Sequence, residues 1–229
     1  MKIKEPLVKI IVLDTDVSIT RTIEEVLKEL PCEIKKANKL SEINEHCDYF
    51  IFYEDSINDE WTKYESPSLA LNPADFDVTS TINFVVKTMS KVAEQKNIKI
   101  IVNSKPETYV YGDEFTIIEV LKNLLDNAIK FSHPGSSIEI HSHYHEKLNK
   151  LVVLVVDSGI GIEREILMNL LVSTKKFTTR GTKGEKGLGL GLLIVKAIID
   201  KHGEHFWIAS EEGKWTRVYF TLKPSKAQN

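Results

Sequence analysis

Four segments with distinctive polar or glycine patterns follow one another between Glu119 and Gly191. They are a helix with two asparagines on one face, a strand that ends in DxGxG, a segment rich in lysine and glycine, and a GxGxG run that begins another helix. Each pattern alone has an ordinary structural explanation. Their order along one stretch of chain is therefore the feature that most restricts the fold.

A polar face runs along the helix predicted over 113–131. Its members follow the spacing i, i+4, i+8 and i+11, so they project from one side: Glu119, Asn123, Asn127 and Lys130. Asparagine is a poor helix former, whereas carboxamide and carboxylate oxygens suit Mg²⁺ and lysine suits phosphate. A solvated polar face is the alternative for this helix alone. The apolar side is expected to contain Phe115, Ile118, Leu121, Leu125 and Ile129.

The second segment places Asp157 at the end of an apolar strand, followed by Gly159 and Gly161. Glycines allow the backbone to turn sharply and to approach a ligand closely. The carboxylate could accept a hydrogen bond from an exocyclic amine, and Ile162 could face an adenine ring. A dinucleotide fingerprint does not fit, because its third glycine would fall on Arg164. A plain Asp-Gly turn is the alternative.

The third and fourth segments run from Lys183 to Lys196, where lysines and glycines lead directly into a helix. Unpaired amides and the helix dipole make such a helix start an anion site. No Gly-Lys-Ser/Thr occurs here, so the Walker A pattern of P-loop enzymes is not met. A loop without a ligand is the alternative.

Strands alternate with helices in the first third of the chain, which implies a small parallel sheet. Residues 54–75 are rich in acids, Ser and Asn and contain two prolines, as in a linker. The rest is expected to be an α+β, two-layer sandwich with helices on one face of a mixed sheet. We predict N-terminal strands at 8–13, 32–36 and 49–53 and helices at 18–30 and 41–47. Later helices are predicted at 78–95, 113–131, 163–172 and 190–202, and strands at 98–102, 137–145, 151–156, 205–210 and 215–222.

Composition excludes several kinds of function. The formal net charge of −3 gives no basic field for DNA or RNA, and the longest apolar stretches are too short to cross a bilayer. Cys32 and Cys47 lack the spacing of a metal site. Two isolated thiols favour a reducing compartment, and therefore a cytoplasmic protein. His141, His143 and His145 alternate along one strand, and exposed strand histidines explain them better than a metal site does.

In this order, the four segments resemble the N, G1, F and G2 boxes of the GHKL ATPases, which have the Bergerat fold, and specifically the catalytic domain of sensor histidine kinases. The matching sequences are NLLDNAIKFS at 123–132, VVDSGIGI at 155–162, KKFTTRGTKGEKGLGLGL at 175–192 and KHGEHFWIASEEGKWTRVYFTL at 201–222. Two positions depart from the family, Leu188 (often Thr or Ser) and Trp215 (often small). The resemblance implies a two-layer sandwich that binds ATP and Mg²⁺, with domain limits at 1–55, a linker at 56–74, the catalytic domain at 75–223 and a tail at 224–229.

The resemblance also implies a role for each matching residue. Asp157 would bind the adenine amine, while Asn123 and Asn127 would hold Mg²⁺ and the phosphates. Catalysis would depend on Glu119, Asn123 and Lys130. Cations of the lid would neutralise phosphate charge: Lys176, Arg180, Lys183 and Lys186. Further contacts to ATP would come from Phe131, Gly159, Gly161, Ile162, Phe177, Gly187, Leu188, Gly189, Leu190 and Gly191.

No histidine of this sequence lies in a phosphoacceptor box. His46, in NEHCDYF, lacks the acidic residue, Arg and Pro expected after it. The resemblance to two-component signalling kinases therefore implies transfer in trans, to a histidine on a helical-hairpin partner, with a response regulator as a further partner. The alternatives are a nucleotide-binding regulatory module without transfer activity and a serine kinase of the anti-sigma type.

The first third of the chain resembles half of a response-regulator receiver domain, as a β-α-β-α-β unit. Asp14 matches one metal-binding acid of that family, but the phosphoacceptor position falls on Tyr53. The resemblance therefore implies a truncated and degenerate receiver. Because a small parallel sheet leaves edges that need cover, we expect 1–65 to pack against the catalytic domain or to self-associate as a homodimer.

Overall fold

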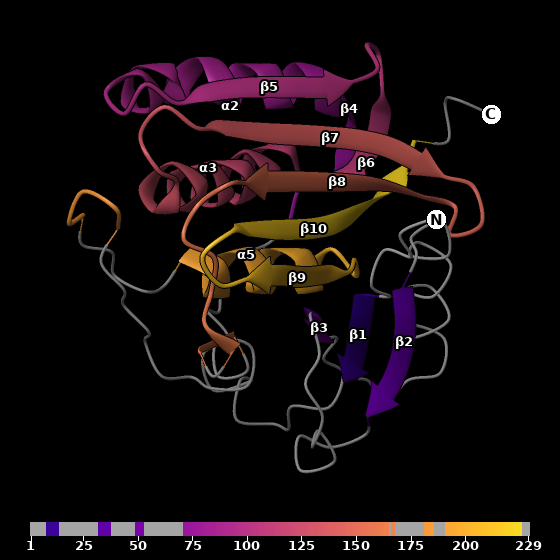
Figure 1. Ribbon diagram of the computed structural model, residues 1–229. Helices are drawn as coiled ribbons and strands as arrows, with labels where there is room; N and C mark the ends of the chain where they lie inside the picture. The colour runs from indigo at the N-terminus through magenta and orange to yellow at the C-terminus, as the bar shows by residue number, and fades with distance from the viewer. Residues whose placement is uncertain are drawn as a thin grey trace, which may run out of the picture.

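The computed structural model describes residues 8–13, 32–37, 49–52, 71–164, 166–167, 181–185 and 191–225 (Figure 1). Near the N-terminus, β1 (Val8–Leu13), β2 (Cys32–Ala37) and β3 (Tyr49–Phe52) form a parallel sheet in the order β2-β1-β3. These strands confirm the three that were predicted in this region. The helices predicted at 18–30 and 41–47 lie outside the described residues, so the receiver-like assignment stays a prediction.

A seven-stranded mixed sheet follows, with the order β4-β6-β10-β8-β7-β5 and with β9 also paired to β10. β5 and β7 are parallel, and all other pairs in this sheet are antiparallel. β4 and β6 were not predicted, because each has four residues and pairs only with distant parts of the chain. The strands are β4 (Ala74–Asp77), β5 (Lys99–Ser104), β6 (Tyr109–Gly112), β7 (Ser137–His145), β8 (Lys150–Asp157), β9 (Phe206–Glu211) and β10 (Trp215–Pro224).

Three helices cover one face of this sheet, namely α2 (Val78–Glu94), α3 (Glu114–Phe131) and α5 (Gly191–Lys201) (Figure 1). Aspartates cap the first two: the Asp77 carboxylate accepts from the Thr79 amide at 3.1 Å, and the Asp113 carboxylate accepts from the Thr116 amide at 3.2 Å. The layers confirm the predicted two-layer sandwich. Within the helix predicted at 163–172, the described residues are 163, 164, 166 and 167, and all of these except residue 163 are helical.

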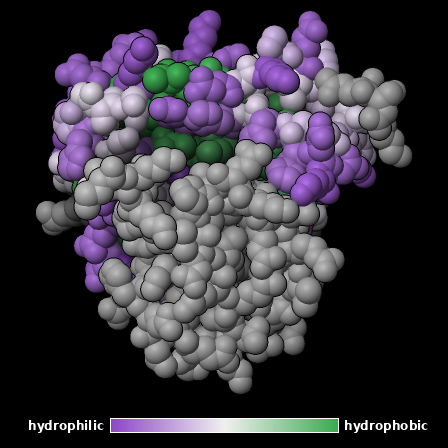
Figure 2. Space-filling model, turned by 45° about the vertical axis from the view of Figure 1, so that its right-hand side comes forward, coloured by the Kyte–Doolittle hydropathy of each residue, from purple (hydrophilic) through white to green (hydrophobic). Residues whose placement is uncertain are grey.

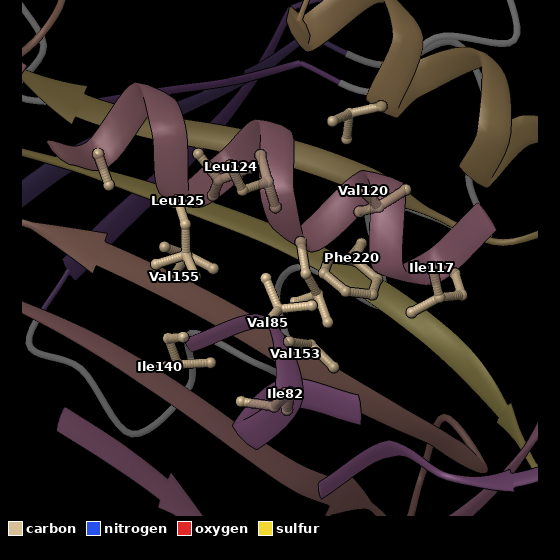
Figure 3. Close-up of a cluster of buried hydrophobic side chains, with 14 of the residues drawn as sticks. Ile82, Val85, Ile117, Val120, Leu124, Leu125, Ile140, Val153, Val155 and Phe220 are labelled. Atoms are coloured by element: carbon tan, nitrogen blue, oxygen red, sulfur yellow. The ribbon is translucent and has the colours of Figure 1, made fainter. Parts of the chain in front are cut away.

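The hydrophobic core lies between α2, α3 and the sheet (Figure 3). Side chains at helical spacing on the two helices meet alternating side chains of the strands. Each of the labelled residues is at most 2% exposed: Ile82, Val85, Ile117, Val120, Leu124, Leu125, Ile140, Val153, Val155 and Phe220. The register places Val218 opposite Val155 and Phe220 opposite Val153, so β8 and β10 form continuous apolar rows under the helices.

The buried side of α3 differs from the predicted apolar stripe at its beginning. Leu121, Leu125 and Ile129 are buried, as predicted, but Phe115 is 83% exposed and Ile118 is only half buried. The core-facing stripe instead begins one position earlier than Ile118, at Ile117, and continues by steps of three and four residues. Phe115 was therefore assigned wrongly to the core.

The described surface is mainly hydrophilic on the side shown in Figure 2, with small apolar areas between polar side chains. Among described residues, the exposed large hydrophobic side chains are Phe84, Val92, Tyr109, Tyr111, Phe115, Tyr144 and Ile194. Apolar side chains of this kind are common on protein surfaces. None of the helices in the described part of the chain is long and apolar enough to span a membrane.

Candidate functional site

Asp157 is the last residue of β8 and lies between two other strands of the sheet. Its register partners are Ile138 of β7 and Thr216 of β10, and only 7% of the residue is exposed. The carboxylate accepts a hydrogen bond from the Gly159 amide at 3.0 Å. Burial raises the pKa of Asp157 to about 7, against the opposing effect of backbone hydrogen bonds from Gly159 and Thr216. A buried carboxyl group with a pKa near neutrality is typical of a functional site.

The turn that follows β8 is held by backbone hydrogen bonds on both sides. The Ile160 amide donates to the Phe131 carbonyl at 3.1 Å, and the Ile160 carbonyl accepts from the Gly213 amide at 2.7 Å. The Ile162 amide, two residues later in the same turn, donates to the Ser210 hydroxyl at 2.9 Å. The turn is therefore fixed between the end of α3 and the β9–β10 hairpin.

Both glycines of this turn are required by close contacts with the protein itself. A Cβ on Gly159 would lie 2.3 Å from the Phe131 carbonyl oxygen. A Cβ on Gly161, which has a φ of 62°, would lie 2.0 Å from the Glu211 carbonyl oxygen. The predicted reason for these glycines was approach to a nucleotide, but packing against protein backbone already accounts for them. Their contact with a nucleotide stays a prediction.

The polar face of α3 meets the first residue of α5. A Cβ on Gly191 would lie 3.1 Å from Asn123 Oδ1 and 3.4 Å from Asn127 Nδ2. The side-chain nitrogen Nδ2 of Asn123 donates to the Glu119 backbone carbonyl at 2.8 Å, which leaves Asn123 Oδ1 on the side of Gly191. Both asparagines are half buried. The structure thus brings together two predicted Mg²⁺ ligands and the start of a helix.

This arrangement suits a phosphate group with its metal ion. The first amides of a helix lack intrahelical partners and carry the positive end of its dipole. Amide oxygens are hard ligands, and Mg²⁺ takes only one or two protein ligands beside phosphates and water. Within the described residues, no group of three or more His, Cys, Asp and Glu could hold a metal by itself. The side-chain oxygens of Asn123 and Asn127 could supply such ligands, and their role in holding Mg²⁺ stays a prediction.

Lys130 and Phe131 lie at the end of α3, next to residues 181–185 of the lysine- and glycine-rich segment. The Lys130 ammonium lies 4.7 Å from the centre of the Phe131 ring. The Lys130 carbonyl accepts from the Thr182 amide at 3.1 Å. A Cβ on Gly181 would lie 2.6 Å from Lys130 Cγ. The structure therefore places residues 181–185 directly against the end of α3.

Lys96, a residue that was not predicted to take part in the site, underlies this contact. It follows α2, is 5% exposed and makes hydrogen bonds to both the α3 end and residues 181–185. Its partners lie 33 to 89 positions away in the sequence, so no local pattern points to them. A lysine just after a predicted helix is indistinguishable from a solvated one.

The other predicted site residues fall into two groups, those that the structure describes and those outside the described ranges. In the first group, Glu119 is exposed, while Ile162 is half buried and packs against the core. His141 pairs with Glu139 at 2.9 Å, and desolvation, His145 and His141 lower the pKa of His143. The predicted residues that lie outside the described ranges are Lys176, Phe177, Arg180, Lys186, Gly187, Leu188, Gly189 and Leu190.

Comparison with known proteins shows that the chain is similar to one family of ATPases and to sensor kinases. The sequence model of the family described as "Histidine kinase-, DNA gyrase B-, and HSP90-like ATPase" matches residues 112–226. The adaptive-response sensory kinase SasA of Synechococcus elongatus is 28% identical over 164 residues, which cover 71% of this chain and 42% of that protein. The sensor histidine kinase WalK of Bacillus subtilis is 28% identical over 175 residues, which cover 75% of this chain and 28% of that protein.

Among solved structures, the catalytic domain of histidine kinase ThkA matches with a TM-score of 0.56 and 27% sequence identity. The match covers 67% of this chain and 99% of that domain. The chain spans less than half of the length of SasA and of WalK. The similarity therefore concerns one domain of these larger kinases.

Proposed function

Because this chain belongs to the histidine kinase-, DNA gyrase B- and HSP90-like ATPase family, we propose that it binds ATP with Mg²⁺ and acts as the catalytic domain of a two-component histidine kinase. The observation that carries the proposal is the approach of Gly191 to both Asn123 and Asn127. It sets a helix start, which favours anions, beside two side-chain amides whose oxygens suit Mg²⁺. The two cysteines, which lack metal spacing, fit a cytoplasmic location.

Asp157 supports the adenine end of the same site. Its carboxyl group lies at the end of β8, is buried, and is oriented by the Gly159 amide. A buried acceptor of this kind would discriminate in favour of a base with an exocyclic amine, because any other base would leave it unpaired. We therefore assign adenine recognition to Asp157, with Ile162 beside the ring.

Phosphoryl transfer depends mainly on positioning and on neutralising charge. When bound, Mg²⁺ would supply charge neutralisation at the phosphates. The chain's own residues would hold the phosphates through the amides of the α5 start, orient the metal through Asn123 and Asn127, and add the positive charge of Lys130. Glu119, one turn before Asn123, is exposed and accepts from the Lys122 ammonium at 3.4 Å, and we assign it to the acceptor side of the site. The acceptor is a histidine on a helical-hairpin partner, in keeping with the sensor kinases to which the chain is similar.

Calorimetric titration of the full chain with ATP and ADP in the presence of Mg²⁺ tests nucleotide binding. Asp157→Ala should weaken binding by roughly 100-fold, since it removes a buried hydrogen-bond acceptor and leaves the adenine amine without a partner. Asp75→Asn, at an exposed aspartate of β4, is the matched control and should bind as the wild type does. Undiminished binding by Asp157→Ala would show that the adenine pocket lies elsewhere.

Transfer is tested separately, with [γ-³²P]ATP and a panel of isolated helical-hairpin domains. Acid-labile label on a partner histidine supports kinase activity. Label on serine would instead support a kinase of the anti-sigma type. Nucleotide binding without any transfer would make the domain a regulatory nucleotide-binding module.

A further inference from the structure

The ammonium group of Lys96 is surrounded by acceptors from two distant parts of the chain. It donates to the carbonyls of Ile129 at 2.7 Å and Lys130 at 3.0 Å. It also lies 2.7 Å from the Thr182 hydroxyl and 2.9 Å from a carboxylate oxygen of Glu185. An ammonium has three N–H groups, so these four acceptors use its whole donor capacity. Lys96 therefore acts through the protein groups that it holds.

Two of the acceptors are carbonyls that the helix itself leaves without partners. The last carbonyls of an α-helix have no intrahelical donor, and a cation at this end also interacts favourably with the helix dipole. In α3, Lys96 serves Ile129 and Lys130, while the Ile160 amide serves Phe131. The end of α3 is thus completed by Lys96 and by the turn after β8.

Residues 181–185 are bound to this helix end mainly through side chains. The Thr182 hydroxyl donates to the Ser132 carbonyl at 2.7 Å, and the Glu185 carboxylate also accepts from the Lys183 amide at 2.7 Å. Burial opposes ionisation of Glu185, but hydrogen bonds from Lys96 and from the backbone outweigh it and lower its pKa to about 2. The Lys96–Glu185 ion pair is therefore the charged centre of this contact.

We propose that Lys96 is a positioning residue for nucleotide binding, because its ion pair with Glu185 fixes residues 181–185 against the end of α3, beside Lys130. The proposal rests on the proposed function, since residues 181–185 come shortly before the helix start at Gly191. Fixing this segment in the free protein would remove part of the ordering cost that a nucleotide otherwise meets on binding. A purely structural cap, in contrast, would affect folding stability without affecting nucleotide affinity.

Glu185→Gln in the full chain tests this role, because it removes the charge and leaves the carbonyls of α3 bound to Lys96. We expect trypsin to cleave after Lys183 about fivefold faster in the nucleotide-free protein, and ADP with Mg²⁺ to bind about fivefold more weakly, as for one charged hydrogen bond at a partly exposed site. The melting temperature should change little. Asp200→Asn, which removes the charge of an exposed aspartate paired with Lys196, is the control and should leave both measurements unchanged.

A double-mutant cycle with Lys96→Met identifies the pair itself. In the Lys96→Met background, Glu185→Gln should have almost no further effect on ADP affinity or on cleavage after Lys183. An equal effect in both backgrounds would overturn the proposal, as would wild-type ADP affinity in Glu185→Gln. Failure of the wild-type chain to bind any nucleotide would instead refute the proposed function, while the cleavage rates would still report on the pair.

Discussion

Two segments pack against the end of α3 in different ways. The turn after β8, residues 158–162, is fixed by backbone hydrogen bonds and by glycines that leave no room for a Cβ. Residues 181–185 are fixed largely by the side chains of Lys96, Thr182 and Glu185. The first arrangement depends on the absence of side chains and the second on their charges. We therefore expect the turn after β8 to respond to added bulk and residues 181–185 to respond to a single change of charge.

Gly161→Ala should have the largest effect on stability, because the added methyl group disrupts the backbone packing of the turn. Its Cβ would lie 2.0 Å from the Glu211 carbonyl oxygen, at a φ of 62°. We expect the free energy of unfolding to fall by about 4 kcal/mol, as for severe overpacking combined with a strained φ. Urea denaturation measures this loss.

Gly203→Ala is the matched control for that variant. Gly203 has a φ of 67°, close to that of Gly161, but nothing lies within 4 Å of its Cβ position. It should therefore show only the conformational cost of about 1 kcal/mol. Equal losses in the two variants would contradict the importance of close backbone packing in the turn.

Lys96→Met should have the next largest effect, since it attacks the segment that side chains hold. The change leaves two helix-end carbonyls and the Glu185 carboxylate without their shared donor. We expect the free energy of unfolding to fall by about 3 kcal/mol, because the buried Lys96 ammonium serves two helix-end carbonyls as well as the partly exposed Glu185 carboxylate. Differential scanning calorimetry would measure this loss of stability. A loss no greater than that of the exposed control Lys122→Met would show that Lys96 does not stabilise the end of α3 and residues 181–185.

Asp157→Asn should have a smaller effect, and one that depends on pH. Burial raises the pKa of Asp157 from 3.8 to about 7 in the folded chain, so between these values the folded state binds more protons than the unfolded state. The contribution of Asp157 to stability therefore falls as the pH rises from about 4 to about 7, and then stays constant. Asn removes this loss, and we expect the variant to be more stable than the wild type by about 2 kcal/mol at pH 8, which is less than the full pKa difference would give. The reason is that Asn has one acceptor oxygen for the backbone hydrogen bonds that the carboxylate accepts from Gly159 and Thr216.

Urea denaturation at pH 5 and pH 8 checks the sign of this effect. The advantage of Asp157→Asn should be much smaller at pH 5, where most of the titration has not yet occurred. The same advantage at both pH values would rule out an elevated pKa as its cause. Asp75→Asn, at an exposed position, should show no comparable change.

Sequence patterns predicted most of the seven-stranded sheet and its helices, because the hydrophobic periodicity of these elements is a local signal. The helix predicted at 113–131 is observed as α3 over Glu114–Phe131, with Asp113 as its cap. The strand predicted at 151–156 is observed as β8 over Lys150–Asp157. Glycine and asparagine spacing likewise indicated Asp157, Asn123 and Asn127 as candidate site residues.

What escaped prediction depends on contacts between distant parts of the chain. β6 pairs through Val110 and Tyr111 with the last two residues of β10, more than a hundred residues later. The partners of Lys96 were equally remote, and the wrong assignment of Phe115 arose because several apolar stripes fit one helix. Only tertiary packing decides which stripe faces the sheet.

The last carbonyls of α3 also link the dynamics of the two segments. The amides of Ile160 and Thr182 donate to the consecutive carbonyls of Phe131 and Lys130, although they are far apart in sequence. Fraying of the final helical turn would expose both amides in the same event. Their hydrogen–deuterium exchange should therefore have a common opening free energy, and a ligand that slows exchange at one amide should slow it at the other.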